Sequence, residues 1–176
     1  SWWSNKILEF SATRQQTPAY MFGLSSDNLG LVNWLSYQFV HSGFSHFFGN
    51  MFFLLLFGVL LELSIGALGL VVVYLLSGFV AAGIFFLCTG PTSAPLVGAS
   101  GSISGIVSLF CIINWRQPIR FLYWLFLPVR GFIGVAFLPA WVIFYIWVAG
   151  DVSGYLSTPS VLGGVAYLAH IGGEAC

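Results

Sequence analysis

The sequence contains very little charge. Of its 176 residues, 6% are Asp, Glu, Lys or Arg, against roughly 25% in ordinary soluble domains. Five basic and five acidic residues give a formal net charge of zero, so the chain has neither a basic surface for nucleic acid nor an acidic tail. By contrast, 59% of the residues are hydrophobic and the mean hydropathy is +0.95. A soluble chain of this length cannot bury so much apolar surface, so the composition predicts an integral membrane protein.

Two common sequence signals are also missing. The cysteines Cys88, Cys111 and Cys176 lack Cys-x-x-Cys spacing, so we expect small apolar core residues and no disulfide framework. Residues 1–28 mix polar and aromatic side chains, without the basic start and apolar run of a cleavable signal peptide. We therefore expect no such peptide.

The pattern of a membrane metalloprotease is absent as well. His41, His46, His170 and Glu174 are of ligand type, but no His-Glu-x-x-His run occurs. The spacing of five between His41 and His46 also separates their rings around a helix. The sequence therefore predicts no metal and no other cofactor.

Apolar stretches make up most of the chain after residue 40. Each is close to the roughly 20 residues that a membrane-spanning helix needs. They lie near 44–64, 67–88, 99–115, 121–149 and 160–176. The fourth is overlong and interrupted by Pro128 and Pro139, so we expect part of it to lie along the membrane surface. The fold class predicted is an all-α polytopic membrane protein with five spanning helices.

The first forty residues differ from the rest. They are the most polar part of the chain and contain scattered aromatic residues, a mixture typical of a segment at the lipid headgroups. We interpret residues 1–176 as one membrane domain, with an interfacial first loop over 1–40 and a helical core over 41–176.

Arginines suggest the orientation. Excess positive charge marks the cytoplasmic side of a membrane protein, and three arginines lie between the third apolar stretch and the middle of the fourth: Arg116, Arg120 and Arg130. The loop 89–98 then lies on the outer side, where Ser100 begins its helix. His170 enters from the same face, about ten residues into the last stretch, or roughly 15 Å deep at 1.5 Å per residue.

A glycine-flanked serine and a lone histidine stand out in this apolar sequence. Ser100 lies between Gly98 and Gly101, and His170 lies in the run Leu-Ala-His-Ile-Gly-Gly. Polar or ionisable side chains are costly in membrane-spanning sequence, so by default they indicate function. Glycine allows close approach to the serine, and histidine is a base that accepts its proton. The two residues are therefore a candidate nucleophile and base.

Candidate donors for an oxyanion lie in the first apolar stretch. His46 and Asn50 are four residues apart and share one helix face. Together with the backbone N–H of Ser100, they supply the hydrogen-bond donors that acyl transfer needs beside the nucleophile. His41 lies off this face, and we expect it at the aqueous rim.

The order of these landmarks resembles that of the rhomboid family of intramembrane serine proteases. The motifs run from His41-x4-His46-x3-Asn50 through Glu62 and Gly98-x-Ser100-Gly101 to Ala169-His170-x-x-Gly173. The resemblance implies a rhomboid-like helical bundle and a serine endopeptidase that cleaves within or beside transmembrane segments. It also implies a Ser100–His170 dyad and an oxyanion hole formed by His46, Asn50 and the Ser100 amide.

The resemblance carries further expectations. The implied partners are transmembrane segments of protein substrates and the lipid bilayer. A multi-pass protein of a bacterial inner membrane, with its site open to the outer face, is the implied location. The helix that precedes the first loop in rhomboids is absent from this sequence and the last helix is short, so we interpret the chain as part of a longer protein. Ser104 stands where the family often has a tyrosine that supports the histidine, and Ser104, Gly98, Gly101, His41 and Gly173 are supporting residues.

Other interpretations remain open. Gly101 and Gly105 form a GxxxG pattern that helix packing alone would explain. A catalytically silent relative that binds transmembrane helices is the alternative to a protease. A transporter would have polar groups dispersed along a path instead of gathered near one face. Glu174, one turn after His170, either contacts the imidazole as a third member would or is protonated or faces a neighbouring helix.

Overall fold

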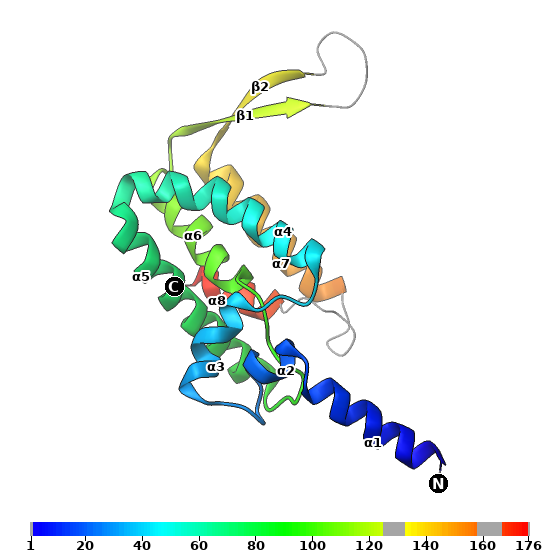
Figure 1. Ribbon diagram of the computed structural model, residues 1–176. Coiled ribbons are helices and arrows are strands. Elements are labelled where there is room, and N and C mark those ends of the chain that lie inside the picture. Colours follow the sequence, from blue (N-terminus) through cyan, green and yellow to red (C-terminus); the bar gives the residue numbers. More distant parts are fainter. Residues whose placement is uncertain (1, 125–132, 158–166, 176) are drawn as a thin grey trace.

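The apolar run from Phe44 to Thr89 folds back at a glycine. The computed structural model describes residues 2–124, 133–157 and 167–175. In it, α4 (Phe44–Phe53) continues through the π-helical turn η2 (Leu54–Gly58) into α5 (Val59–Thr89). Gly66 has φ 77° and ψ 165°, a conformation that favours glycine, and the helix turns sharply there (Figure 1). The break falls between the predicted stretches 44–64 and 67–88.

Membrane-spanning capacity is clearest in this same run. Judged by length and hydropathy, Phe44–Thr89 is the one helical run of the described residues that could cross a bilayer, and the apolar helix α6 (Ser100–Ile113) is shorter. The described structure is mostly helical. The five spanning helices remain a prediction.

Helix α6 occupies the centre of the bundle. It packs against α5, against α7 (Ala140–Ser157) and against α8 (Tyr167–Glu174). Its bounds agree with the predicted stretch 99–115, and most of its side chains are buried. Because α6 is surrounded by its neighbours, the residues at its first turn are held in a fixed place.

The contact between α6 and α8 requires glycine. A methyl group added at Gly173 would collide with the carbonyl oxygen of Gly101 and come within 3.3 Å of Ser104 Cβ. Backbone oxygen cannot move aside cheaply, because it belongs to the α6 helix. The small residues therefore allow the two helices that carry Ser100 and His170 to approach closely.

We expect Gly173→Ala to destabilise the protein by about 1–3 kcal/mol, the usual cost of overpacking. Gly83→Ala in α5 is the matched control, since nothing lies within 4 Å of its added methyl and alanine favours helix. Thermal unfolding in detergent measures both. Equal melting temperatures for the two variants would contradict the close contact.

The fourth apolar stretch is not one helix, and here the all-α prediction is wrong. Strands β1 (Pro118–Trp124) and β2 (Ile133–Pro139) form an antiparallel pair, with Pro118 opposite Pro139, and α7 begins only at Ala140. Proline at the two outer ends disfavours helix, and aromatic and β-branched residues between them favour strand. Pro128 and Arg130 lie outside the described residues.

The N-terminal segment lies at the opposite end of the molecule from this hairpin (Figure 1). Its elements are α1 (Trp2–Gln15), α2 (Pro18–Phe22), α3 (Leu31–Ser36) and the 3₁₀ helix η1 (Tyr37–Phe39). Leu24 and Leu96 exchange backbone hydrogen bonds of 3.0 and 2.7 Å, and the Ser26 amide donates to the Thr92 carbonyl at 2.9 Å. The loop that leads into Ser100 is therefore tied to the first loop.

The two cysteines that the structure describes differ in burial. Cys111 is buried in α6, as expected, but Cys88 is exposed, so its prediction as a core residue is wrong. Cys88 lies next to the end of α5 at Thr89, beside the exposed Leu87, on a face that no described element covers. Cys176 lies outside the described residues.

Candidate active site

Ser100 is the first residue of α6. The first N–H groups of a helix have no intrahelical acceptor, so the Ser100 amide is free to donate. The Ser100 side chain is partly exposed, and no hydrogen bond joins its hydroxyl to another described residue. The nucleophile candidate and one oxyanion donor therefore lie together at a helix N-terminus.

Gly98 shapes the approach to this helix. It has φ +124°, and its amide donates to the Tyr37 carbonyl at 2.9 Å. A methyl group here would lie 2.8 Å from His46 Cε1 and 2.9 Å from His46 Nε2. Glycine thus provides both the backbone conformation and the space for the His46 ring.

We expect Gly98→Ala to destabilise the protein by about 1–3 kcal/mol because of backbone strain. It should also lower the cleavage that the sequence analysis predicts, since the added methyl displaces His46. Gly43→Ala is the control: Gly43 has an extended backbone, φ 174°, and nothing within 4 Å of its added methyl. Melting temperature and reporter cleavage are measured together, and a Gly98→Ala variant as active as Gly43→Ala contradicts this role.

His46 and Asn50 lie on one face of α4 and line the same cavity as Ser100 and His170. The cavity has a volume of about 430 Å³ and is also lined by Trp147. Asn50 is 7% exposed, and its Nδ2 is buried without a hydrogen-bond partner. An unpaired buried amide is costly, so this nitrogen is a donor held ready for an acceptor in the cavity.

The His46 ring is held by the loop before α4. Its Nδ1 lies 3.0 Å from the Ser42 hydroxyl. If that hydroxyl donates, the ring proton is on Nε2, the atom beside Gly98. This tautomer makes His46 a second side-chain donor toward the cavity.

His170 forms a short contact that the sequence analysis did not predict. Its Nδ1 lies 2.8 Å from Asp151 Oδ1 on α7, and both side chains are nearly buried, at 13% and 11% exposed. His170 Nε2 is buried and has no hydrogen-bond partner among the described residues. The ring therefore has one nitrogen fixed by a carboxylate and the other available as a base.

Asp151 was missed because the predicted helix ended at residue 149. Since the strands occupy the beginning of that stretch, α7 extends to Ser157 and carries Asp151 into the bundle. An acidic residue in apolar sequence was the signal that could have found it. The Tyr167 ring also contacts His170 edge-on, with centroids 5.8 Å apart.

Glu174 turns toward α7. His170 Nδ1 is occupied by Asp151, and the Glu174 carboxyl interacts electrostatically with Asp151 on α7. This geometry agrees with the alternative in which Glu174 faces a neighbouring helix.

Ser104 lies one turn after Ser100 and is fully buried. Its hydroxyl accepts a hydrogen bond from Trp147 Nε1 at 3.3 Å, and its Cβ lies next to Gly173. Ser104 thus joins α6 to α7 and packs against α8 near the base.

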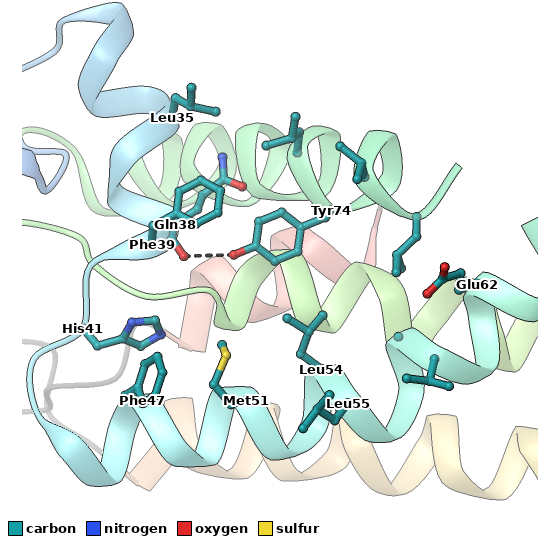
Figure 2. Close-up of a pocket in the computed structure, with 15 residues that line it drawn as sticks. Leu35, Gln38, Phe39, His41, Phe47, Met51, Leu54, Leu55, Glu62 and Tyr74 are labelled. Carbon is teal, nitrogen blue, oxygen red and sulfur yellow. Dashed lines mark hydrogen bonds between the residues drawn. The ribbon is translucent and has the colours of Figure 1, made fainter. Parts of the chain in front are cut away.

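His41 and Glu62 line a different cavity, of about 740 Å³, between η1, α4 and α5 (Figure 2). Its wall is mostly apolar, and the Tyr74 hydroxyl donates to the Gln38 carbonyl there at 3.0 Å. The His41 ring lies edge-on to His46, with centroids 5.2 Å apart, and burial lowers the pKa of His41. His41 thus contacts His46, a candidate oxyanion donor, but does not itself line the cavity of Ser100. The Glu62 side chain is exposed.

No group of three or more histidines, cysteines or carboxylates lies close enough to hold a metal ion within the part of the chain that the structure describes. The cavity of Ser100 is lined by groups that can carry out acyl transfer. They include a hydroxyl, an imidazole bound to a carboxylate, and hydrogen-bond donors.

Comparison with known proteins identifies the family of this chain. The family model of the rhomboid domain matches residues 28–176. The chain belongs to the rhomboid family, whose members are integral membrane proteins.

Three similar proteins are eukaryotic, and the bacterial location remains a prediction. Rhomboid-like protein 11, chloroplastic, of Arabidopsis thaliana is 35% identical over 95 residues, which is 49% of this chain and 34% of that protein. Rhomboid-related protein 3 of Homo sapiens is 35% identical over 85 residues, 47% of this chain and 20% of that protein. Inactive rhomboid protein 1 of Drosophila melanogaster is 32% identical over 130 residues, 70% of this chain and 9% of that protein. The chain thus matches about a third or less of the length of these relatives.

Proposed function

We propose that this protein is an intramembrane serine endopeptidase that cleaves transmembrane segments of other membrane proteins. The observation that carries the proposal is the cavity of about 430 Å³ lined by His46, Asn50, Ser100 and His170. These residues come from three helices and supply a nucleophile, a base and oxyanion donors in one place. No cofactor takes part.

The reaction follows from these groups. As Ser100 Oγ attacks the scissile carbonyl carbon, its proton passes to His170 Nε2. The negative charge on the carbonyl oxygen is met by the Ser100 amide, His46 Nε2–H and Asn50 Nδ2–H. The C–N bond then breaks, and His170 gives its proton to the leaving nitrogen.

Water completes the cycle. It attacks the acyl ester while His170 accepts its proton, and the ester bond breaks as the proton returns to Ser100. The substrate backbone must be extended at this point, because a helix keeps its carbonyls hydrogen-bonded. Segments with glycine, proline or small polar residues unwind most easily in the membrane. The orientation predicted by the arginines opens the site to the outer face.

Covalent labelling tests this proposal. Purified protein in detergent is treated with a fluorophosphonate, and the labelled peptide is mapped. Modification at Ser100, with Ser102 and Ser104 unmodified, is expected, since Ser100 alone of the three lines the cavity. Absence of label at Ser100 in folded protein would contradict a protease.

The second candidate is a silent rhomboid that binds transmembrane helices without cutting them. The similarity to Inactive rhomboid protein 1 over 70% of this chain favours it. Such a protein would bind a reporter segment but show neither labelling nor cleavage. Retention of both Ser100 and His170 in one cavity favours the protease.

A further inference from the structure

Two carboxyl groups meet behind the candidate base. Asp151 Oδ1 faces His170 Nδ1 at 2.8 Å, while Asp151 Oδ2 and Glu174 Oε1 are buried and have no hydrogen-bond donor. Glu174 lies one turn after His170 on α8, which packs against α7, and its carboxyl interacts electrostatically with that of Asp151. Two ionised carboxylates cannot hydrogen-bond to each other, since both only accept. A single proton between them gives each oxygen a partner.

The described lining of the cavity contains no basic side chain other than histidine. No lysine or arginine is among the described residues that line this cavity, whose ionisable members are His46, Asp151 and His170. The Tyr167 ring lies against His170, and α5 presents Ala81 and Ile84 to α8 next to the base. Two adjacent negative charges here would lack a cation apart from the histidines, and like charges at close range disfavour double ionisation.

We propose that Asp151 and Glu174 share one proton and together position His170 for catalysis. Glu174 donates the shared proton to Asp151 Oδ2, and Asp151 Oδ1 accepts the Nδ1–H of His170. This arrangement leaves His170 Nε2 unprotonated on the side of the cavity that holds Ser100. The inference rests on the proposed peptidase function and extends its Ser–His pair by two positioning residues on α7 and α8.

Kinetics of three variants test the pair. Asp151→Asn is expected to lower kcat by about 10²–10⁴-fold, the range of acid–base catalysis, with little change in KM, because Asp151 acts through the His170 ring that it holds at 2.8 Å. Glu174→Gln should have a kcat close to that of the unmodified protein, because the glutamine amide always donates to Asp151. Glu174→Leu should lower kcat about tenfold, because Asp151 Oδ2 loses its donor.

An infrared spectrum tests the shared proton without relying on activity. The carbonyl stretch of a protonated carboxyl is expected in the unmodified protein at neutral pH and should disappear in Glu174→Gln. Glu9→Gln is the control, because Glu9 is exposed and paired with Lys6 at 2.7 Å. The infrared measurement still tests the shared proton if Asp151→Asn does not fold.

The outcomes separate the two proposals. Unchanged kcat in Asp151→Asn, or a Glu174→Gln variant as slow as Glu174→Leu, overturns the positioning pair while cleavage by Ser100 stands. A protonated-carboxyl band that persists in Glu174→Gln overturns the shared proton. If the unmodified protein neither cleaves nor accepts the fluorophosphonate, the peptidase function fails, and the infrared band still reports on the pair.

Discussion

Replacing Ser100 by alanine is expected to abolish cleavage and leave the folded protein intact. The serine supplies the oxygen that forms the acyl ester, and the proposed mechanism assigns this step to no other residue of the cavity lining. Its hydroxyl makes no hydrogen bond to another described residue, so the substitution removes no hydrogen bond within the described structure. Cleavage of a reporter transmembrane segment in liposomes and thermal unfolding measure the two properties.

Ser102→Ala is the matched control for this experiment. Ser102 is buried two residues further along α6, and its hydroxyl donates to Gln38 Oε1 at 3.0 Å. Its loss leaves a buried acceptor unpaired and should cost about 1–3 kcal/mol of stability. The two serines should therefore show opposite patterns: Ser100→Ala loses turnover alone, and Ser102→Ala loses stability alone. Undiminished turnover in purified Ser100→Ala would contradict the proposed mechanism.

The second large effect is expected at Asn50. Asn50→Ala should lower kcat by about 10²–10³-fold, the usual cost of one oxyanion donor, with little change in KM. The interaction strengthens only as charge develops on the carbonyl oxygen. Because Asn50 Nδ2 has no partner in the structure, its removal should leave the melting temperature nearly unchanged. Steady-state kinetics with the reporter segment separate kcat from KM.

Asn33→Ala provides the comparison. Asn33 is also buried, but its Nδ2 donates to the carbonyl oxygens of Met21 and Gly23, both at 3.0 Å. This variant should be less stable and keep kcat when folded. If Asn50→Ala changes only KM, Asn50 binds substrate or supports structure instead of stabilising the oxyanion.

Local chemistry made much of the helical core predictable. The predicted boundary between the stretches 44–64 and 67–88 coincides with the turn at Gly66, and the predicted stretch 99–115 contains α6. Helix spacing placed His46 and Asn50 on one face before any coordinates were considered. In these segments a single principle, helical periodicity or the freedom of glycine, determines the outcome.

The rest depended on tertiary structure. Apolar content alone could not distinguish a membrane helix from the strands β1 and β2, because aromatic and β-branched residues suit both. That error hid Asp151, which enters the bundle only because α7 begins after Pro139. The pairing of Asp151 with His170 joins residues on different helices, and no periodicity within one segment reports it.

The order of the site residues along the chain affects its biosynthesis. His46, Asn50 and Ser100 are translated early, whereas Asp151 and His170 follow on α7 and α8. On the proposed mechanism, a ribosome-bound chain carries its nucleophile and oxyanion donors before its base has been synthesised. The nascent chain therefore cannot cleave a neighbouring segment during membrane insertion until α8 packs against α6.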